Sequence, residues 1–135
     1  MGGVLAGRGV FEVAAFIAAP LAGTTLAGLG AEVIRVEQLG GGIDARRWPV
    51  HNGRSLYRAG LDRGKRSLAI DLRSDRGQSL VAELVCGGGS DGGILVTNLA
   101  ARGWMAYERL REQRPDLIMV VVKGTSAGGT AVDYT

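Results

Sequence analysis

Two short cationic segments carry the side chains best suited to binding an anionic ligand. Arg46-Arg47-Trp48 joins two guanidinium groups to an aromatic ring, and Arg63-Gly64-Lys65-Arg66 packs three cations into four residues before a predicted strand. Guanidinium groups favour planar, two-pronged hydrogen bonding to phosphate or carboxylate. Each segment is therefore a candidate for binding a phosphorylated ligand. The alternative in each case is a solvated surface turn, with one buried tryptophan in the first segment.

A third candidate, Lys123, ends the most apolar stretch of the sequence, DLIMVVVK. A lysine at the end of a buried strand is rarely without a partner, so Lys123 is a candidate for anion binding. The alternative is that its ammonium group reaches solvent while its stem lies along the strand.

Other kinds of site find little support in the sequence. A single cysteine, Cys86, excludes an internal disulfide framework and a cysteine-based zinc cluster. The thirteen acidic residues include no DxD or ExxE cluster, so we expect no metal site. Gly40-Gly41-Gly42 matches neither GxGxxG nor the Walker A sequence, and the turn at residues 14–21 has no glycine. These patterns argue against a dinucleotide site.

The composition predicts one globular domain. The 135 residues are 46% apolar and 21% charged, so the chain can bury a core. No apolar run reaches the roughly 18 residues of a membrane span. The net charge of +3 is mild, and no aromatic residues alternate with the basic ones as in a platform for single-stranded nucleic acid. We therefore expect no membrane and no nucleic acid as partner, and a single cysteine is consistent with a cytoplasmic location.

Hydrophobic periodicity predicts the elements that must position these groups. One helix is expected from Pro20 to Gly30, and residues 40–66 are expected to be irregular. A second helix is expected after Ser74, which can cap it, with a buried face formed by Leu80, Leu84 and Val85. A third is expected to end at Pro115 and to carry Trp104, Tyr107, Leu110 and Arg111. Strands are expected at residues 8–15, 32–37, 67–72, 94–97 and 116–123.

This alternation predicts right-handed βαβ units and an open, mostly parallel α/β sheet. The last strand is almost purely apolar, which is typical of a strand covered on both faces. Ligands of such sheets bind at the carboxyl ends of the strands. We therefore expect the functional groups at residues 14–16, 37–42, 72–74, 98–102 and 123–126.

Several segments, in this order, resemble the amino-terminal part of the family III CoA-transferases. They are VFEVAAFIAAPLAGTTLAGLGAEVIRVE, GGGIDARRWPV, SLYRAGLDRGKRSLAIDLRSDRGQ, ILVTNLAARGW and RPDLIMVVVKG. The family includes formyl-CoA transferase, carnitine CoA-transferase and α-methylacyl-CoA racemase. The most specific stretches are LGAEVIRVE and residues 62–72, where Asp62 replaces the usual Asn. GGGIDARRWPV and the terminal VDYT most resemble the mesaconyl-CoA C1–C4 transferases, also called 2-methylfumaryl-CoA isomerases.

The resemblance implies an open Rossmann-like fold with flanking helices, coenzyme A or acyl-CoA as substrate, and no metal. It places Phe16 in the lining of the CoA pocket, Ile70 and Arg73 where the adenine and ribose-phosphate rest, and Lys123 near the ligand. Gln38 stands at the position of a family arginine, so one phosphate contact is changed there. It also assigns a substrate loop, with Arg46 and Trp48.

The resemblance further implies covalent catalysis, in which an aspartate attacks the acyl-CoA thioester to form a mixed anhydride. Asp133 does not match that aspartate. The catalytic aspartate is expected beyond this chain, so no catalytic residue is assigned. The chain is then expected to be a single CoA-binding domain, residues 1–135, without the family's second domain and return segment. Alone it would be inactive, and it would form a homodimer or associate with a second chain.

The function expected from the sequence is therefore the CoA-binding portion of an enzyme that moves CoA between carboxylic acids, or within one acyl group. Two alternatives stay open. One is a racemase-like enzyme, which the resemblance does not support because Val132 replaces the racemases' catalytic histidine. The other is a non-catalytic interaction module.

Overall fold

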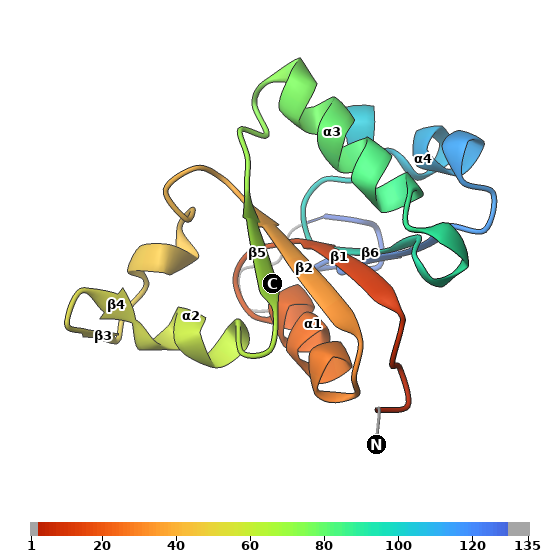
Figure 1. Cartoon of the computed structure of the whole chain (residues 1–135). Helices are drawn as coiled ribbons and strands as arrows, with labels where there is room; N and C mark the ends of the chain where they lie inside the picture. The colour runs from red at the N-terminus through yellow and green to blue at the C-terminus, as the bar shows by residue number, and fades with distance from the viewer. Residues whose placement is uncertain (1–2, 130–135) are drawn as a thin grey trace.

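Five parallel strands form the central sheet of the computed structural model, which describes residues 3–129 (Figure 1). Across the sheet their order is β5-β2-β1-β6-β7, and every neighbouring pair is parallel. The predicted α/β fold with a mostly parallel sheet is confirmed. The strands are β1 (Gly9–Val13), β2 (Glu32–Glu37), β5 (Arg66–Ala69), β6 (Ile94–Thr97) and β7 (Ile118–Val121).

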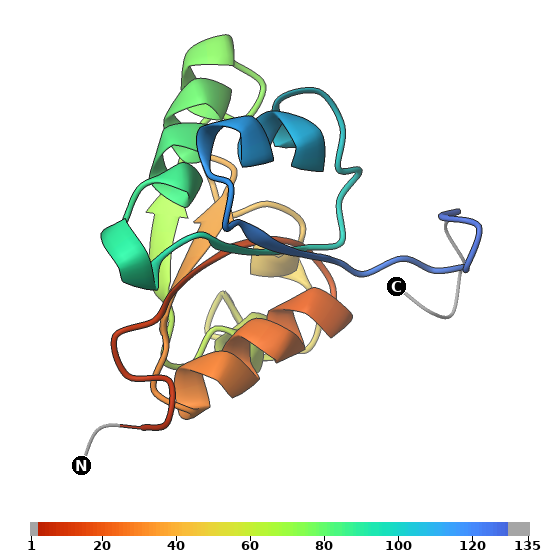
Figure 2. The ribbon, with the colours of Figure 1, turned by 90° about the vertical axis from the view of Figure 1, so that its right-hand side faces the viewer.

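Helices cover both faces of the sheet (Figure 2). Helix α1 (Ala18–Gly28) lies on one face, against β1, β2 and β6, and α3 (Asp75–Cys86) and α4 (Tyr107–Gln113) lie on the other. Successive side chains of a strand point to opposite faces, so Phe11 and Val13 join the core under α3 and α4 while Val10 joins the core under α1. Of the described helices, none is long and apolar enough to cross a bilayer.

Helix α3 begins as predicted but presents a different face to the sheet. The Ser74 hydroxyl accepts a hydrogen bond from the Gly77 amide at 3.1 Å, which caps the helix. Val81 and Val85 are fully buried, whereas Leu80 and Leu84 are 44% and 38% exposed. The predicted buried face is therefore wrong for the two leucines and correct for Val85. The face that packs on the sheet is shifted by about one residue along the helix, which is a rotation of roughly 100° from the predicted face.

Replacing Leu110 by alanine is expected to lower the free energy of unfolding by about 2–5 kcal/mol. Its side chain is fully buried in the core under α3 and α4. The same substitution at the exposed Leu80 is expected to cost less than about 0.5 kcal/mol. Urea denaturation followed by circular dichroism measures both changes, and equal losses would contradict the observed orientation of α3.

Residues 40–66, expected to be irregular, contain several short elements. A hairpin of β3 (Val50–His51) and β4 (Arg54–Ser55) turns at Asn52-Gly53, with φ of 48° and 75°. Asn-Gly is the preferred sequence for such a turn, so this hairpin could have been predicted. The 3-10 helix η1 (Asp44–Arg46) precedes it, and α2 (Leu56–Leu61), capped by Ser55, follows it.

Strand β7 lies at the edge of the sheet. The prediction that both of its faces are covered is wrong, because only one face packs against the core. Met119 packs into the core under α3 and α4. Ile118 and Val120, which face the other way, are 57% and 49% exposed. No described element covers them, because α1 packs against β1, β2 and β6.

Two short 3-10 helices, η2 (Gly89–Asp91) and η3 (Gly103–Met105), flank β6. Trp104, which was predicted in the same helix as Tyr107, belongs to η3 rather than to α4.

Candidate functional site: a crevice at the carboxyl ends of the strands

Two adjoining hollows lie at the carboxyl ends of the strands, where the strand order reverses between β2, β1 and β6. The first has a volume of about 240 Å³ and the second about 310 Å³. Leu99 lines both, so the two hollows meet there. The first is lined by residues 13–15, 35–38 and 41–44 with Leu72 and Leu99, and the second by residues 98–102 and 121–124 with Gly128 and Gly129.

The two hollows differ in charge. Glu37, Asp44 and Arg35 line the first, which we call the acidic hollow. Arg102 and Lys123 line the second, which we call the basic hollow, and its described lining has no acidic residue. An anionic group is therefore favoured in the basic hollow, and hydrogen-bond donors are favoured next to the Glu37 and Asp44 carboxylates of the acidic one.

Side-chain hydrogen bonds to the backbone hold the tip of β1 in place between the hollows. Asn98, just after β6, accepts from the Ala15 amide at 3.0 Å and donates to the Ala15 carbonyl at 2.7 Å. Phe16 has a left-handed backbone, with φ of 65°, and its amide donates to Asp44 Oδ2 at 3.1 Å. These contacts set the position of the segment that separates the two hollows.

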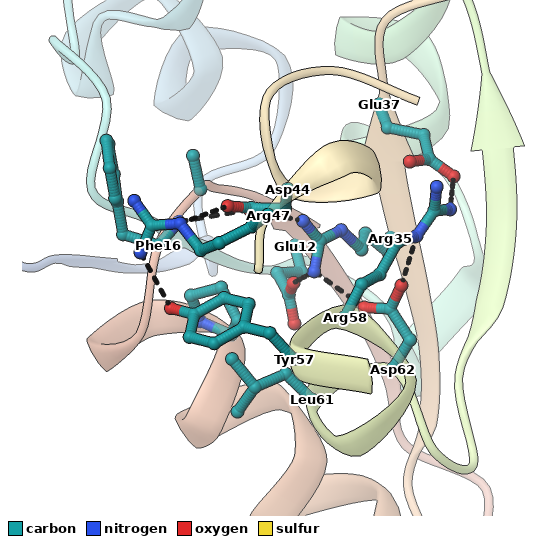
Figure 3. A network of polar contacts seen from close by, with 12 residues as sticks. Glu12, Phe16, Arg35, Glu37, Asp44, Arg47, Tyr57, Arg58, Leu61 and Asp62 are labelled. Carbon is teal, nitrogen blue, oxygen red and sulfur yellow. Dashed lines mark hydrogen bonds and ion pairs between the residues drawn. The ribbon is translucent and has the colours of Figure 1, made fainter. Parts of the chain in front are cut away.

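Buried and partly buried ion pairs connect the loop after β2 to the sheet (Figure 3). Arg35 lies 2.9 Å from Asp44 and 2.6 Å from Asp62. Arg58 of α2 lies 2.5 Å from Glu37 and 2.8 Å from Asp62. Asp44 thus ties η1 to β2, and Asp62, which contacts both arginines, ties the end of α2 to β2. Of these elements, η1 contributes Asp44 to the wall of the acidic hollow.

A second buried pair lies behind this wall. The Lys65 ammonium is 2.6 Å from Glu12 Oε2 and donates to the Pro20 carbonyl at 2.7 Å. Both side chains are essentially inaccessible, and burial raises the pKa of Glu12 against the opposing effects of Lys65 and Arg35. The hypothesis that Lys65 binds phosphate is therefore wrong. Its neighbour Arg66 pairs with Glu32, and Arg63 is exposed.

All five predicted cofactor-binding residues lie at the carboxyl-end edge of the sheet. Gln38 lines the acidic hollow and Lys123 the basic one, although Lys123 is exposed because β7 is an edge strand. Phe16 adjoins the crevice through Asp44. Ile70 packs against the core, and Arg73 is exposed in the turn before α3.

The predicted substrate loop is placed differently from its sequence interpretation. Trp48 is 82% exposed, so the alternative of a buried tryptophan is wrong, and Arg46 is exposed as well. Arg47, between them, is instead the partly buried residue, stacked on Phe16. Arg47 belongs to the Arg46-Arg47-Trp48 candidate segment, whereas Asp44 and Arg102 were not singled out from sequence, although both lie in segments that carried the family resemblance. Val132 and Asp133 lie outside the described residues.

The fold defines an α/β protein with a crevice at the switch point of a parallel sheet, the usual place for a ligand in this architecture. The family model of CoA-transferase family III matches residues 5–134, and the chain belongs to that family. The resemblance noted from the sequence motifs is thereby confirmed.

Individual relatives agree with this assignment. The chain is 53% identical over 137 residues to 2-methylfumaryl-CoA isomerase of Chloroflexus aurantiacus, covering 100% of this chain and 34% of the relative. It is 39% identical over 126 residues to succinyl-CoA–D-citramalate CoA-transferase of the same organism, covering 89% and 30%. A solved CAIB/BAIF family protein from Brucella suis superposes with a TM-score of 0.83 at 31% identity, covering 99% of this chain and 38% of that chain. The chain thus spans about a third of the length of the curated relatives it matches.

Proposed function

We propose that this chain provides the CoA-binding part of a family III CoA-transferase site, which moves CoA between carboxylic acids or within one acyl group. The observation that carries the proposal is the pair of hollows at the switch point, one basic and one acidic. Coenzyme A carries its negative charge on phosphates, and its hydrogen-bond donors include an adenine amine, two pantetheine amides and hydroxyl groups. A basic and an acidic hollow side by side suit these two kinds of group.

In this proposal Arg102 and Lys123 bind CoA phosphate oxygens through charge-assisted hydrogen bonds. The acidic hollow takes N–H donors of the ligand. Glu37 Oε2 and Asp44 Oδ1 are buried there and have no hydrogen-bond partner among the described residues. A buried acceptor without a partner costs free energy, so a ligand donor that reaches these oxygens gains affinity.

The proposed reaction requires a carboxylate nucleophile that attacks the thioester carbonyl, forming a mixed anhydride and releasing the CoA thiolate. Glu37 and Asp44 line the crevice but are ion-paired with Arg58 and Arg35. Their negative charge is thereby stabilised and their nucleophilicity lowered, so we assign them to binding and positioning. The reacting carboxylate is proposed to come from outside residues 3–129.

We further propose that the acyl group is dicarboxylic. The names of the relatives above contain 2-methylfumaryl, succinyl and citramalate groups, each of which has a second carboxylate.

Association with a second copy or another chain also stays a prediction. It is favoured by the exposed Ile118 and Val120 on β7 and is tested by light scattering, where a clean monomer would contradict it.

Isothermal titration with CoA tests the proposed site. Wild-type protein is expected to bind CoA, and Lys123→Gln is expected to weaken binding roughly 10- to 100-fold, because a hydrogen bond to a charged group contributes about 1.5–3 kcal/mol. Arg109→Gln, which also removes one positive charge, at an exposed position of α4 that lines neither hollow, is the matched control and should change affinity less than about twofold. No heat with millimolar CoA on folded protein would contradict the proposal, as would equal losses in the two variants.

A further inference from the structure

We propose that Arg47 is the specificity-determining residue that binds the free carboxylate of the acyl group. This inference rests on the proposed function and adds to it the residue that distinguishes a dicarboxylic acyl-CoA from a monocarboxylic one. Three properties of Arg47 carry it: a fixed guanidinium plane, donors without protein acceptors among the described residues, and a position beside Asp44, which lines the acidic hollow.

Two aromatic rings fix the plane of the Arg47 guanidinium. Its central carbon lies 4.5 Å from the centroid of the Phe16 ring and 4.9 Å from that of Tyr57, within the range of cation–π contacts. The Tyr57 hydroxyl also accepts a hydrogen bond from Nη1 at 3.3 Å (Figure 3). A side chain held in this way loses less conformational entropy when it binds a ligand.

Most donors of Arg47 have no hydrogen-bond acceptor among the described residues, and its one ion pair, with Asp44, is long. A guanidinium carries five N–H groups, and within residues 3–129 the only hydrogen bond from this one goes to Tyr57. Nε is 3.9 Å from Asp44 Oδ1, too far for a hydrogen bond. The other Asp44 oxygen is already occupied by Arg35 and the Phe16 amide. Nη2 therefore remains available for an incoming acceptor, and the side chain is 30% exposed.

Arg47 lies apart from the two cations that are proposed to bind CoA phosphate. Arg47 contacts Phe16 at the tip of β1 and approaches Asp44, which lines the acidic hollow. The basic hollow, proposed for phosphate, lies on the far side of Leu99 with its own two cations. A planar guanidinium with adjacent free N–H groups matches two oxygens of a carboxylate or of a phosphate. Because the basic hollow supplies the cations proposed for phosphate, we assign Arg47 to the carboxylate.

The test compares three ligands by isothermal titration: CoA, glutaryl-CoA, and valeryl-CoA, which has the same five-carbon acyl chain without the second carboxylate. Wild-type protein is expected to bind glutaryl-CoA more tightly than valeryl-CoA. Arg47→Met keeps the apolar stem and should weaken glutaryl-CoA roughly 10- to 100-fold, while CoA and valeryl-CoA change less than about twofold. Arg47→Lys, which keeps the charge but not the planar fork, should lose part of the preference and serves if Arg47→Met does not fold.

The outcomes separate this inference from the proposed function. CoA binding with equal affinity for glutaryl-CoA and valeryl-CoA would overturn the role of Arg47 alone. An equal loss for all three ligands in Arg47→Met would also overturn it, and would show that Arg47 binds CoA itself, through a phosphate. No binding of CoA by folded wild-type protein would overturn the proposed function and this inference together.

Discussion

Gly23→Ala is expected to lower the free energy of unfolding by about 3 kcal/mol or more, although glycine-to-alanine changes in a helix usually stabilise. Gly23 is buried in α1 where that helix crosses the Glu12–Lys65 pair. A Cβ built on Gly23 would overlap Glu12 Oε2 and lie 3.2 Å from Lys65 Cε. The substitution therefore forces the helix or the buried carboxylate to move, and either movement breaks the ion pair.

Gly28→Ala is the matched control for this prediction. Gly28 lies in the same helix, and a Cβ there would meet no atom within 4 Å. It should leave stability unchanged or raise it by up to about 1 kcal/mol. Urea denaturation of both variants measures the difference. A Gly23→Ala protein as stable as Gly28→Ala would show that Glu12 does not lie against α1.

Lys65→Met is expected to destabilise the protein by about 3–5 kcal/mol at neutral pH, because removing one partner of a buried ion pair leaves the other charge uncompensated. Methionine keeps most of the apolar stem of lysine, so the loss reports mainly on the charge. Among residues 3–129, Glu12 would then retain Arg35 alone as a counter-ion, at 3.7 Å. Chemical denaturation across a range of pH values measures the effect.

The pH dependence gives this prediction a definite sign. Burial already raises the folded-state pKa of Glu12 above its ordinary 4.5, and removing Lys65 raises that pKa further. A raised carboxyl pKa contributes stability that is present below 4.5 and lost as pH rises through the folded-state pKa. The penalty of Lys65→Met should therefore be largest near neutral pH and shrink as pH falls toward 4.5.

Glu12→Gln in the Lys65→Met background provides the control. It removes the uncompensated charge while keeping the size of the side chain, so it should restore part of the lost stability at neutral pH and flatten the pH dependence. A penalty of Lys65→Met that does not change with pH would contradict the assignment of the effect to the Glu12 charge.

Local patterns in the sequence determined much of this molecule. Alternating apolar stretches predicted the five parallel strands, Ser74 predicted the start of α3, and the topology rule predicted a ligand crevice at the carboxyl ends. These features depend on spacing within a few residues and on rules that hold for any parallel sheet, so a single sequence is sufficient to infer them. The Asn52-Gly53 turn is a local signal of the same kind, although the hairpin it forms was not predicted.

Only the tertiary structure decided which cations are available to a ligand. Lys65 is buried in an ion pair with Glu12, which lies 53 residues earlier in the chain, and so is not available to a ligand. Arg47 rather than Arg46 points inward, because it packs against the rings of Phe16 and Tyr57. The faces of α3 and β7 likewise depended on where α1 and the sheet came to lie. The physical reason is the same in each case: a charge or an apolar side chain is defined by its partner, and partners far apart in the sequence meet only in the folded chain.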